Sequence, residues 1–554
     1  MIDFKTKDLK GDLFGGLTAG VVALPLALAF GEASGAGPIA GLYGAIFVGF
    51  FASLFGGTGS QVTGPTGPMV VVFAGVYAAL DGNPSLVFTT VVLAGAIQIA
   101  FGVFKLGQYI RLVPYPVISG FMSGIGCIII ALQTSRLLGH EPEGSGTIPA
   151  LVEIPSAVAD PNFAALILGV LTLLIAFKWP ARLAKIVPPP LAALIIGTLA
   201  SLFLSGAPIL GDIPTGLPSF IMPSLNQDTI LIVFEAALIL ALLGSIDSLL
   251  TSLVADNMTR TRHNSNRELI GQGIGNVVAG LFGGIASAGA TMRTVINIRT
   301  GGTTKISGML HSLFLLAIVI VLAPLAANIP HTVLAGILIK TGWDIIDRAY
   351  IVKAHRGPRW DLALMLLVLT LTVFVDLITA VVAGVVLASL AFVKQIADEQ
   401  LKSLRDITNE GLSINFSEEE VELMTHAHKR INVFDFGGPL SFGAAADVGH
   451  QIREKSKGPS QVMIFDFSQV PFIDVSAARA METIANDGKV SNKLVYISGM
   501  TDQIRTMLTE LMGDIVPREQ YFDSRRDAIA AAVEFVESTE ANPSQGGGAE
   551  PSPA

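Results

Sequence analysis

Long uncharged stretches alternate with short basic loops over the first 400 residues of the chain. No Asp, Glu, Lys or Arg occurs in residues 33–80, 112–135, 186–211, 269–292 or 306–339. A run of about 18 mostly apolar residues is long enough to cross a bilayer as a helix. The pattern therefore predicts an α-helical membrane protein.

Fourteen apolar segments can be placed in this part, and two of them, 66–80 and 291–298, are too short to cross alone. The segments are 13–31, 36–56, 66–80, 85–104, 113–135, 161–177, 186–205, 229–255, 268–285, 291–298, 306–328, 332–346, 361–376 and 378–393.

The basic loops support this number, because lysine and arginine gather on the cytoplasmic side of membrane proteins. With the N-terminus inside, fourteen crossings place five basic loops inside: Lys105–Arg111, Lys178–Lys185, Arg260–Arg267, Arg299–Lys305 and Lys340–Arg359. The loops expected outside, 136–160 and 206–228, are acidic. We therefore expect the N-terminus and the C-terminal part to be cytoplasmic.

The composition changes after Lys394. Residues 1–398 form the predicted membrane domain and 399–430 a charged linker with a helix and a loop. In residues 431–540 short apolar strands such as 461–467 and 493–499 alternate with amphipathic helices, which predicts a small α/β domain. The Gly/Pro/Ser/Glu-rich tail, 541–554, is predicted to be disordered.

The two short segments indicate an internal repeat. Gly and Pro residues directly precede the first, around Thr66, and glycines precede the second, around Ala290, which lies 224 residues later. The same offset places residues 13–31 over 237–255. Seven segments per half is an odd number, so the second half must insert upside down. The sequence thus predicts a 7+7 inverted repeat with paired broken helices.

Broken helices at membrane depth indicate a binding site. Backbone without helical partners is tolerated there only when it is buried or lines a wet cavity. Each helix start presents free N–H groups and about half a positive charge. Two facing starts therefore favour a small anion, although each Gly/Pro cluster could also be a simple kink or a site of close packing.

Composition excludes a soluble enzyme, a secreted disulfide scaffold and a disordered protein. Hydrophobic residues make up 51% of the chain and charged ones 14%, against roughly 25% charged in a soluble domain. Cys127 is the only cysteine, so no intrachain disulfide can form. The net charge of -9 gives no indication of nucleic-acid binding. No P-loop, His/Cys metal cluster or enzyme motif is present, so we expect neither an enzyme nor a cofactor.

Asp247 lies inside an apolar segment, where a charge is costly and commonly marks an ion pathway. Thr251 is four residues further on and shares its helix face. With backbone carbonyls near Gly289, these oxygens suit Na⁺ or a transferable proton. The alternative is that Asp247 only caps a helix or pairs with Arg293.

Arg293 follows the second break and admits two interpretations. It either adds a positive charge beside the anion or anchors the cytoplasmic side with Arg299. Thr66 and Thr291 stand at the two helix starts, where capping is the default role of a hydroxyl and anion contact the alternative. In the α/β domain, Ser476 is predicted as a helix N-cap, with phosphorylation or docking as the regulatory alternative.

These motifs resemble those of the sulfate permease (SulP) family. The resemblance rests on GDLFGGLTAGVVALPLALAFGEASG, TGPTGPM, GSIDSLLTSLVADNMTRTRHNSNRELIGQG and GGIASAGATMRTVINIRTGG, and the C-terminal block resembles the family's STAS domain. It implies fourteen segments in core and gate subdomains, a homodimer in the bacterial inner membrane, and elevator-like anion transport.

The membrane part looks most like the BicA-type bicarbonate transporters of that family. The resemblance implies a sodium site at Asp247, Thr251, Gly289 and Thr291, and a bicarbonate site at Thr66, Ala290 and Thr291. Arg293 departs from that branch, which tends to have a small residue there, and matches the sulfate and dicarboxylate carriers, although those often have glutamate in place of Asp247.

Charge counting leaves the ion open. Two helix starts and Arg293, less ionised Asp247, give about +1, and neutralising Asp247 gives about +2. The first value suits bicarbonate and the second sulfate. We expect a secondary transporter, with bicarbonate favoured over sulfate and Na⁺ over H⁺. The alternatives are a proton-coupled sulfate or dicarboxylate carrier, an uncoupled anion channel, and a nonconducting STAS-linked sensor.

Overall fold

The computed structural model of the chain divides into two compact units, Met1–Ala388 and Ser389–Ala554. Residues 9–541 are described apart from 111–113, 141–146, 185–186, 205, 211–217, 376, 404, 407–415, 426–429, 457 and 513–514. The predicted disordered tail therefore lies outside the described residues except for Ala541, which ends a helix.

Each of the fourteen apolar segments contains one helix, as the sequence predicts. These helices are α1 (Leu9–Ala33), α2 (Pro38–Phe55), α3 (Gly67–Ala79), α4 (Pro84–Val103), α6 (Tyr115–Leu137), α8 (Phe163–Lys178), α10 (Pro189–Ser201), α11 (Ile230–Thr259), α12 (Ser265–Leu281), α13 (Thr291–Arg299), α14 (Lys305–Ala326), α15 (His331–Ile345), α17 (Arg359–Phe374) and α18 (Leu377–Ser403).

Four further helices of the membrane unit were not predicted: α5 (Gly107–Ile110), α7 (Thr147–Ala159), α9 (Ala181–Ala184) and α16 (Arg348–Ala354). Within the described residues, six helices are long and apolar enough to span a bilayer, or seven if the bent pair α7 and α8 counts as one span. The number of fourteen spans stays a prediction, because several helices, α3 and α13 among them, are short.

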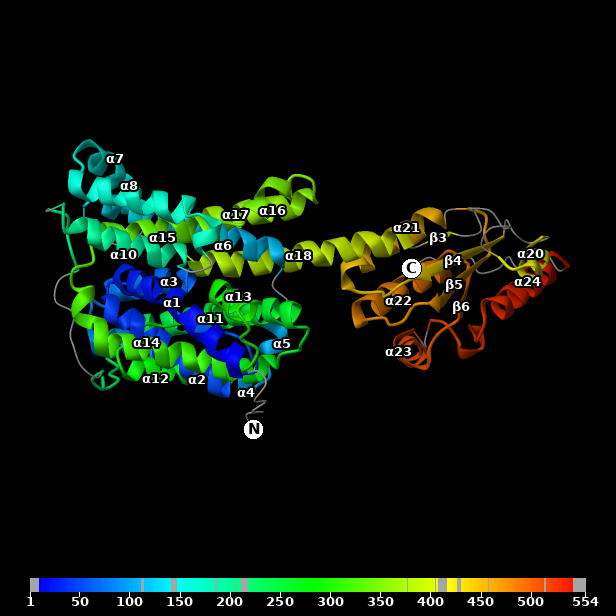
Figure 1. The fold of residues 1–554 in the computed structure, drawn as a ribbon. Helices are drawn as coiled ribbons and strands as arrows, with labels where there is room; N and C mark the ends of the chain where they lie inside the picture. Colours follow the sequence, from blue (N-terminus) through cyan, green and yellow to red (C-terminus); the bar gives the residue numbers. More distant parts are fainter. Residues whose placement is uncertain are drawn as a thin grey trace. The chain divides into compact units, whose positions relative to one another are not determined.

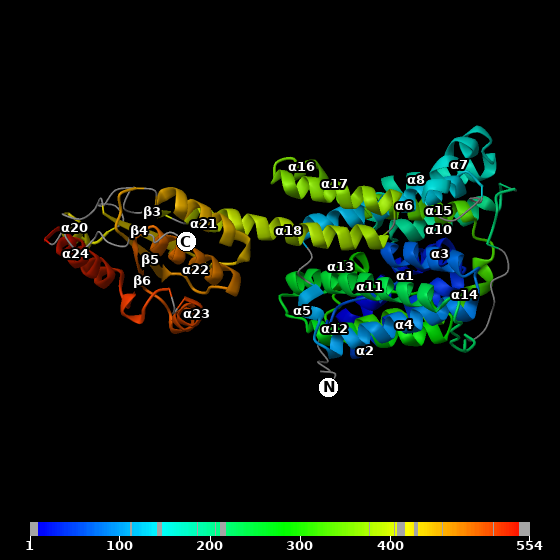
Figure 2. The same cartoon turned by 180° about the vertical axis from the view of Figure 1, so that it is seen from behind.

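The helices of the membrane unit form two layers (Figures 1 and 2). The core layer consists of α1–α4 and α11–α14, and the gate layer of α6, α8, α10, α15 and α17. In the core layer α1 packs on α13 and α14, and α11 packs in the same way on α3 and α4. Helices α11–α14 begin 221 to 227 residues after α1–α4, so each is the repeat counterpart of one of them. The first helix of each repeat thus packs on the third and fourth helices of the other repeat, as the predicted repeat requires.

Small residues allow the core helices to approach closely. A Cβ on Gly95 in α4 would lie 2.5 Å from the Gly273 carbonyl oxygen in α12, and a Cβ on Gly273 would lie 2.5 Å from that of Gly95. Helices in lipid associate through such close backbone contacts rather than through the hydrophobic effect. Glycine at these two positions therefore holds α12, and the polar residues it carries, close to α4.

The C-terminal unit is a five-stranded sheet in the order β3–β4–β5–β6–β7, with β3 antiparallel and the other strands parallel. Its strands are β3 (Arg405–Asp406), β4 (Ile431–Gly437), β5 (Val462–Gln469), β6 (Leu494–Ser498) and β7 (Tyr521–Phe522). Its helices are α20 (Glu418–Met424), α21 (Phe442–Lys455), α22 (Val475–Val490), α23 (Asp502–Met512) and α24 (Arg525–Ala541).

Side chains alternate along these strands and build two cores. Phe434 and Phe465 face α21, α22 and α23, whereas Val433 and Ile464 face α20 and α24. This period of two is what a sheet covered on both faces requires. The predicted α/β domain is therefore present, although α21 was not predicted. The predicted linker helix is the end of α18, since no proline interrupts the helix between Leu377 and Ser403.

Candidate functional site

Two helices of the core layer begin side by side at a short antiparallel pairing. Strand β1 (Thr63–Gly64) pairs with β2 (Ala288–Gly289), with Thr63 opposite Gly289 and Gly64 opposite Ala288. The Ala290 amide also donates to the Val62 carbonyl at 2.8 Å. Helix α3 begins at Gly67 and α13 at Thr291. The Gly/Pro clusters thus end two strands and start two helices at one point, as the repeat predicts.

The two helix starts are not equivalent. The first three residues of a helix carry amide N–H groups that no helical carbonyl accepts. In α3 the second of these residues is Pro68, which has no N–H. In α13 the three residues Thr291, Met292 and Arg293 all carry one. The second helix start therefore offers more donors to an anion than the first.

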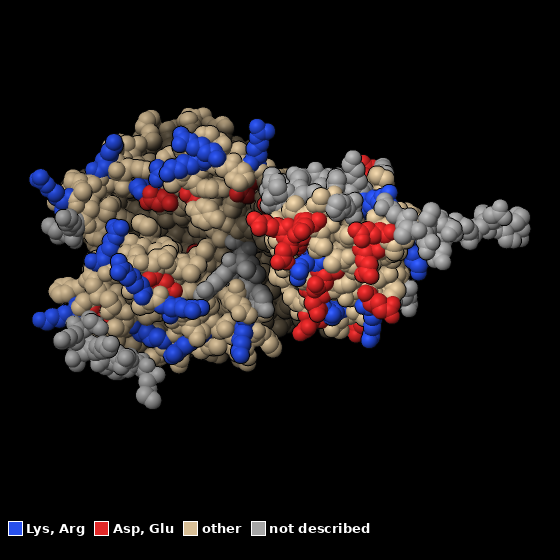
Figure 3. All heavy atoms as spheres, turned by 90° about the vertical axis from the view of Figure 1, so that its right-hand side faces the viewer, with Lys and Arg blue, Asp and Glu red and all other residues tan. Residues whose placement is uncertain are grey.

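A cavity of about 550 Å³ lies between the core and gate layers at these helix starts. The core layer contributes six of the predicted site residues to its wall: Thr66, Asp247, Gly289, Ala290, Thr291 and Arg293. The gate layer contributes residues of α6, α8, α10 and α15, including Lys340 and Asp344. Figure 3 shows that the membrane unit is hollowed between its upper and lower parts. Lysines and arginines gather on the face of this unit that is turned to the viewer.

The cavity wall brings a carboxylate, hydroxyls and a carbonyl together. Oδ2 of Asp247 and the buried Thr66 hydroxyl close to this carboxylate make no hydrogen bond of normal geometry among the described residues. Behind them the Thr251 hydroxyl donates to the Gly289 carbonyl at 3.0 Å and lies 2.7 Å from the Thr291 hydroxyl. These oxygen atoms are of the kind that binds Na⁺, and the unpartnered carboxylate oxygen could equally accept a proton.

Arg293 is buried beside the cavity, whereas Arg299 is exposed at the surface. Arg293 has only 2% of its surface exposed. Nη2 donates to the Pro65 carbonyl in the turn that begins α3, whereas Nη1 has no partner among the described residues. Of the two interpretations that the sequence left open, the structure thus favours a positive charge at the cavity. No hydrogen bond joins Asp247 to Arg293 among the described residues, so pairing with Arg293 does not occupy the Asp247 carboxylate.

The capping roles expected for the two threonines are wrong. Thr66 occupies the N-cap position of α3, but its side chain accepts no hydrogen bond from the helix. At α13 the N-cap position belongs to Ala290, and Thr291 is the first helical residue. The backbone enters each helix from a paired strand, so neither hydroxyl caps the helix, and the Thr291 hydroxyl contacts that of Thr251 at 2.7 Å instead.

Ser476 is also not an N-cap. Asp474 holds that position of α22 and accepts the Ala477 amide at 2.8 Å. A carboxylate accepts hydrogen bonds more strongly than a hydroxyl and is favoured at a helix start. Ser476 lies two residues further on and is exposed. The predicted regulatory role of Ser476 therefore stays a prediction at an accessible position.

Several polar residues behind the site were missed in the sequence. Ser248 accepts the Gly289 amide at 3.0 Å, and Gln61 is fully enclosed beneath the same glycine. One signal was present: Ser245, Ser248 and Ser252 recur three and four residues apart, which places hydroxyls on one face of an otherwise apolar helix. Lys340 and Asp344 could not be assigned to the cavity, because the sequence does not show which gate helix faces it.

Comparisons with known proteins identify the family of the chain. A family model described as the sulfate permease family matches residues 9–368, and one described as the STAS domain matches residues 422–524. The chain is 42% identical over 536 residues to a Synechocystis protein named bicarbonate transporter BicA, with 95% of each chain covered. It is 32% identical to the putative sulfate transporter YvdB of Bacillus subtilis, with 88% of this chain and 91% of that one covered.

A solved structure leads to the same family. The transmembrane domain of a cyanobacterial bicarbonate transporter BicA matches 69% of this chain and 99% of its own at 48% identity, with a TM-score of 0.65. These relatives are transporters and not enzymes, which agrees with the lack of an enzyme motif in the sequence. The chain belongs to the sulfate permease family and carries a C-terminal STAS domain.

Proposed function

We propose that this protein is a secondary active transporter of a small inorganic anion, with bicarbonate as the favoured substrate and Na⁺ as the coupling ion. The identity to proteins named bicarbonate transporter BicA supports the choice of bicarbonate. The two helix starts at the cavity support an anion in general. The acting unit would be a homodimer in the bacterial inner membrane, with the STAS domain in the cytoplasm.

One observation carries the proposal: the Asp247 carboxylate shares the cavity with both helix starts and with Arg293. With Asp247 ionised, the fixed charges sum to about +1 and hold a monovalent anion weakly. A sodium ion bound by Asp247, Thr251 and the Gly289 carbonyl would raise the sum to about +2. The anion would then bind more tightly, and by reciprocity it would strengthen sodium binding.

The two-layer architecture supports transport by relative movement of the layers. The cavity wall comes from both layers, whereas the oxygen atoms for the cation come from the core layer alone. A core layer that slid along the gate would carry both ions and expose them on the other side. The wall includes Lys340 and Asp344 near the basic loop 340–359, so the cavity would open to the cytoplasm.

Arg293 supports a second candidate, a proton-coupled sulfate carrier. Protonation of Asp247 would also leave about +2 in the cavity, which balances a divalent anion. The similarity to the putative sulfate transporter YvdB points in the same direction. The two candidates share the site and differ in the ion that neutralises Asp247.

Uptake into proteoliposomes containing the purified full-length protein distinguishes the candidates. We expect labelled bicarbonate to accumulate when Na⁺ is higher outside, and unlabelled bicarbonate, more than sulfate, to compete. Uptake that does not depend on the sodium gradient but is driven by an inward proton gradient would contradict this proposal and support the proton-coupled sulfate carrier. Flux without accumulation under either gradient would indicate an uncoupled channel, and no flux of any anion a nonconducting sensor.

A further inference from the structure

Beneath the cavity, α12 carries a buried row of polar side chains. Glu268, Gln272 and Asn276 are spaced four residues apart on one face, and each is at most 1% exposed. Such residues are costly inside a membrane protein unless their hydrogen-bonding capacity is used. None of the three lines the cavity, so direct contact with an ion does not explain them.

Glu268 is saturated by four donors. Oε2 accepts the amides of Gly57 and Thr58 at 2.8 and 2.9 Å. Oε1 accepts Nε2 of Gln61 at 3.0 Å and Nε2 of Gln272 at 2.9 Å. A single carboxylate thus holds the backbone of the segment that leads from α2 into β1.

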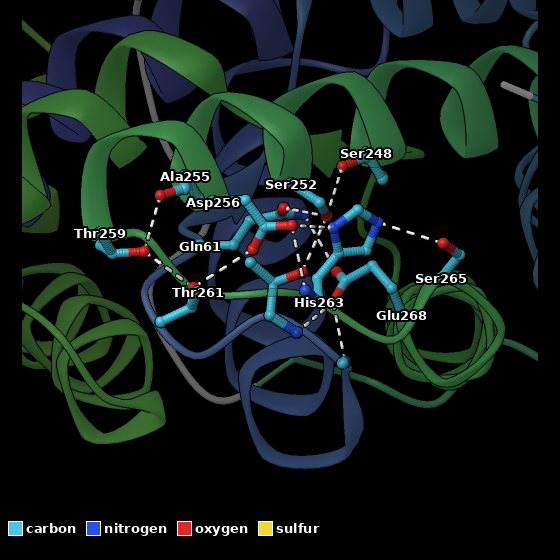
Figure 4. Close-up of polar contacts among 12 residues, drawn as sticks. Gln61, Ser248, Ser252, Ala255, Asp256, Thr259, Thr261, His263, Ser265 and Glu268 are labelled. Carbon is cyan, nitrogen blue, oxygen red and sulfur yellow. Dashed lines mark hydrogen bonds and ion pairs between the residues drawn. The ribbon is translucent and has the colours of Figure 1, made fainter.

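Gln61 transmits this constraint to the second strand. Its Oε1 accepts the Ser252 hydroxyl of α11 at 2.8 Å, as Figure 4 shows together with Glu268. Its Nε2 occupies the space that a Cβ on Gly289 would need. Gln61 therefore supports from below the Gly289 peptide whose carbonyl accepts the Thr251 hydroxyl.

Gln272 acts in parallel on the first strand. The same Nε2 that donates to Glu268 also donates to the Thr63 hydroxyl at 2.8 Å, and Thr63 is the residue opposite Gly289 in the strand pairing. Glu268 is thus connected to both strands that precede α3 and α13.

We propose that Glu268 is a positioning residue for the transport site, one that fixes both helix starts through Gln61 and Gln272 without touching either ion. The inference rests on the proposed function of the cavity. Site geometry must hold to about 0.5 Å for tight binding, and Glu268 supplies that rigidity from α12. In Glu268→Gln the side-chain amide nitrogen would face two N–H groups whose hydrogen bonds it cannot accept. The strands that precede α3 and α13 would then be held less rigidly.

Asp12 provides a matched control. It is likewise fully buried, and its Oδ1 accepts the backbone amides of Thr303 and Thr304 at 2.8 and 2.9 Å. It lies ten residues before Val22, the first α1 residue in the cavity wall, which is about 15 Å along the helix. Asp12→Asn therefore removes a similar buried carboxylate without reaching the site.

The experiment compares transport kinetics of both variants with the wild type in proteoliposomes. We expect Glu268→Gln to raise the KM for sodium and for bicarbonate about tenfold, as loss of a supporting carboxylate does at metal sites, while the maximal rate stays within about twofold. Asp12→Asn should leave both KM values within about twofold of the wild type. Equal KM values in the two variants would show that Glu268 is only structural.

Ser252→Ala covers the case in which Glu268→Gln does not fold. It removes the hydroxyl that orients Gln61 and should raise both KM values about threefold, the effect of one weak hydrogen bond; unchanged values would overturn the inference. Failure of the proposed function would appear separately, as a wild type without sodium-dependent bicarbonate uptake. The KM comparison would then be made with the anion that the wild type does take up.

Discussion

Each unit contains an arginine near an aspartate, and the two pairs differ in how fully their hydrogen-bonding capacity is used. In the C-terminal unit Arg525 donates to both oxygens of Glu420 at 2.9 and 3.0 Å. Asp466 there accepts the hydroxyls of Ser468 and Ser498 and lies 3.5 Å from Arg525. In the membrane unit Arg293 has only the Pro65 carbonyl, and Oδ2 of Asp247 has no partner among the described residues.

This difference separates charges that stabilise the fold from charges that bind and release an ion. Buried charges that stabilise a fold have their hydrogen bonds satisfied. Charges that must bind and release an ion need unused capacity in the empty site. The unpartnered atoms of Arg293 and Asp247 are buried and belong to two residues that line one cavity, whereas the satisfied ones of Arg525 and Asp466 lie in a packed domain. The comparison therefore predicts opposite effects for equivalent substitutions.

The largest contrast is expected between Asp247→Ala and Asp466→Ala. Loss of Asp247 should lower sodium-driven uptake at least about a hundredfold, since a lost charged contact of about 3 kcal/mol is worth that factor. It should leave the unfolding free energy within about 1 kcal/mol. Loss of Asp466 should cost about 3 kcal/mol of stability, because it removes a buried carboxylate that accepts the hydroxyls of Ser468 and Ser498 and lies 3.5 Å from Arg525.

The two units can be followed separately in the full-length protein. All three tryptophans, Trp179, Trp343 and Trp360, belong to the membrane unit, so tryptophan fluorescence during heating reports on that unit. Amide hydrogen exchange of β5 and β6 reports on the other. Retained gradient-driven uptake in Asp247→Ala, or a membrane unit that unfolds in it, would contradict the assignment of Asp247 as a charge that binds and releases an ion.

A smaller effect is expected from pH in the C-terminal unit. Burial raises the pKa of Glu420, but the hydrogen bonds from Arg525 and Ser417 outweigh it, so the pKa lies below its ordinary value of 4.5. A carboxyl whose pKa is lowered by folding contributes stability above the unfolded value, and that stability is lost as pH falls through the folded one. We expect the contribution to be complete above about pH 5 and to be lost progressively as the pH falls below 4.5 and through the lowered pKa of Glu420.

Scanning calorimetry of the wild type and of Glu420→Gln tests this expectation. The transition that Asp466→Ala shifts identifies the C-terminal unit. At pH 7 the variant should be less stable by about 1 kcal/mol, the value for a pair that solvent partly screens. The difference should shrink as the pH falls below 4.5, and a difference that grew with acid would mean that Glu420 is not ionised in the folded protein.

The smallest contrast concerns the start of α22. Asp474→Ala should destabilise the C-terminal unit by about 1 kcal/mol, because it removes the N-cap. Ser476→Ala should change stability by less than about 0.5 kcal/mol, since this residue is exposed. Hydrogen exchange of the first turn of α22 measures both, and a larger effect at Ser476 would restore the capping role that the sequence suggested.

Much of the fold could be predicted because its determinants are local. Uncharged length places the fourteen helices, period-two alternation places the central strands, and Gly/Pro clusters place both breaks. Helix α7 was missed, since Glu153 and Pro155 make its sequence resemble a loop. Helix α21 was missed because its alanine- and glycine-rich sequence gives a weak pattern.

The site was only partly predictable because its contacts connect distant segments. Asp247 and Thr251 stand out as polar residues in an apolar helix. The direction of Arg293 could not be read, since α13 has only nine residues and its inward face depends on the turn at Pro65. The bond between Gln61 and Glu268 joins residues 207 apart, and no local spacing reveals such a partner.

The pairing of β1 with β2 has a consequence for how the molecule can be assembled. One strand comes from each repeat, so each half of the chain supplies the edge on which the other half's broken helix starts. Neither half could build a binding pocket alone. Two fragments divided in the connection before α11 should therefore rebuild the binding pocket only when they are expressed together.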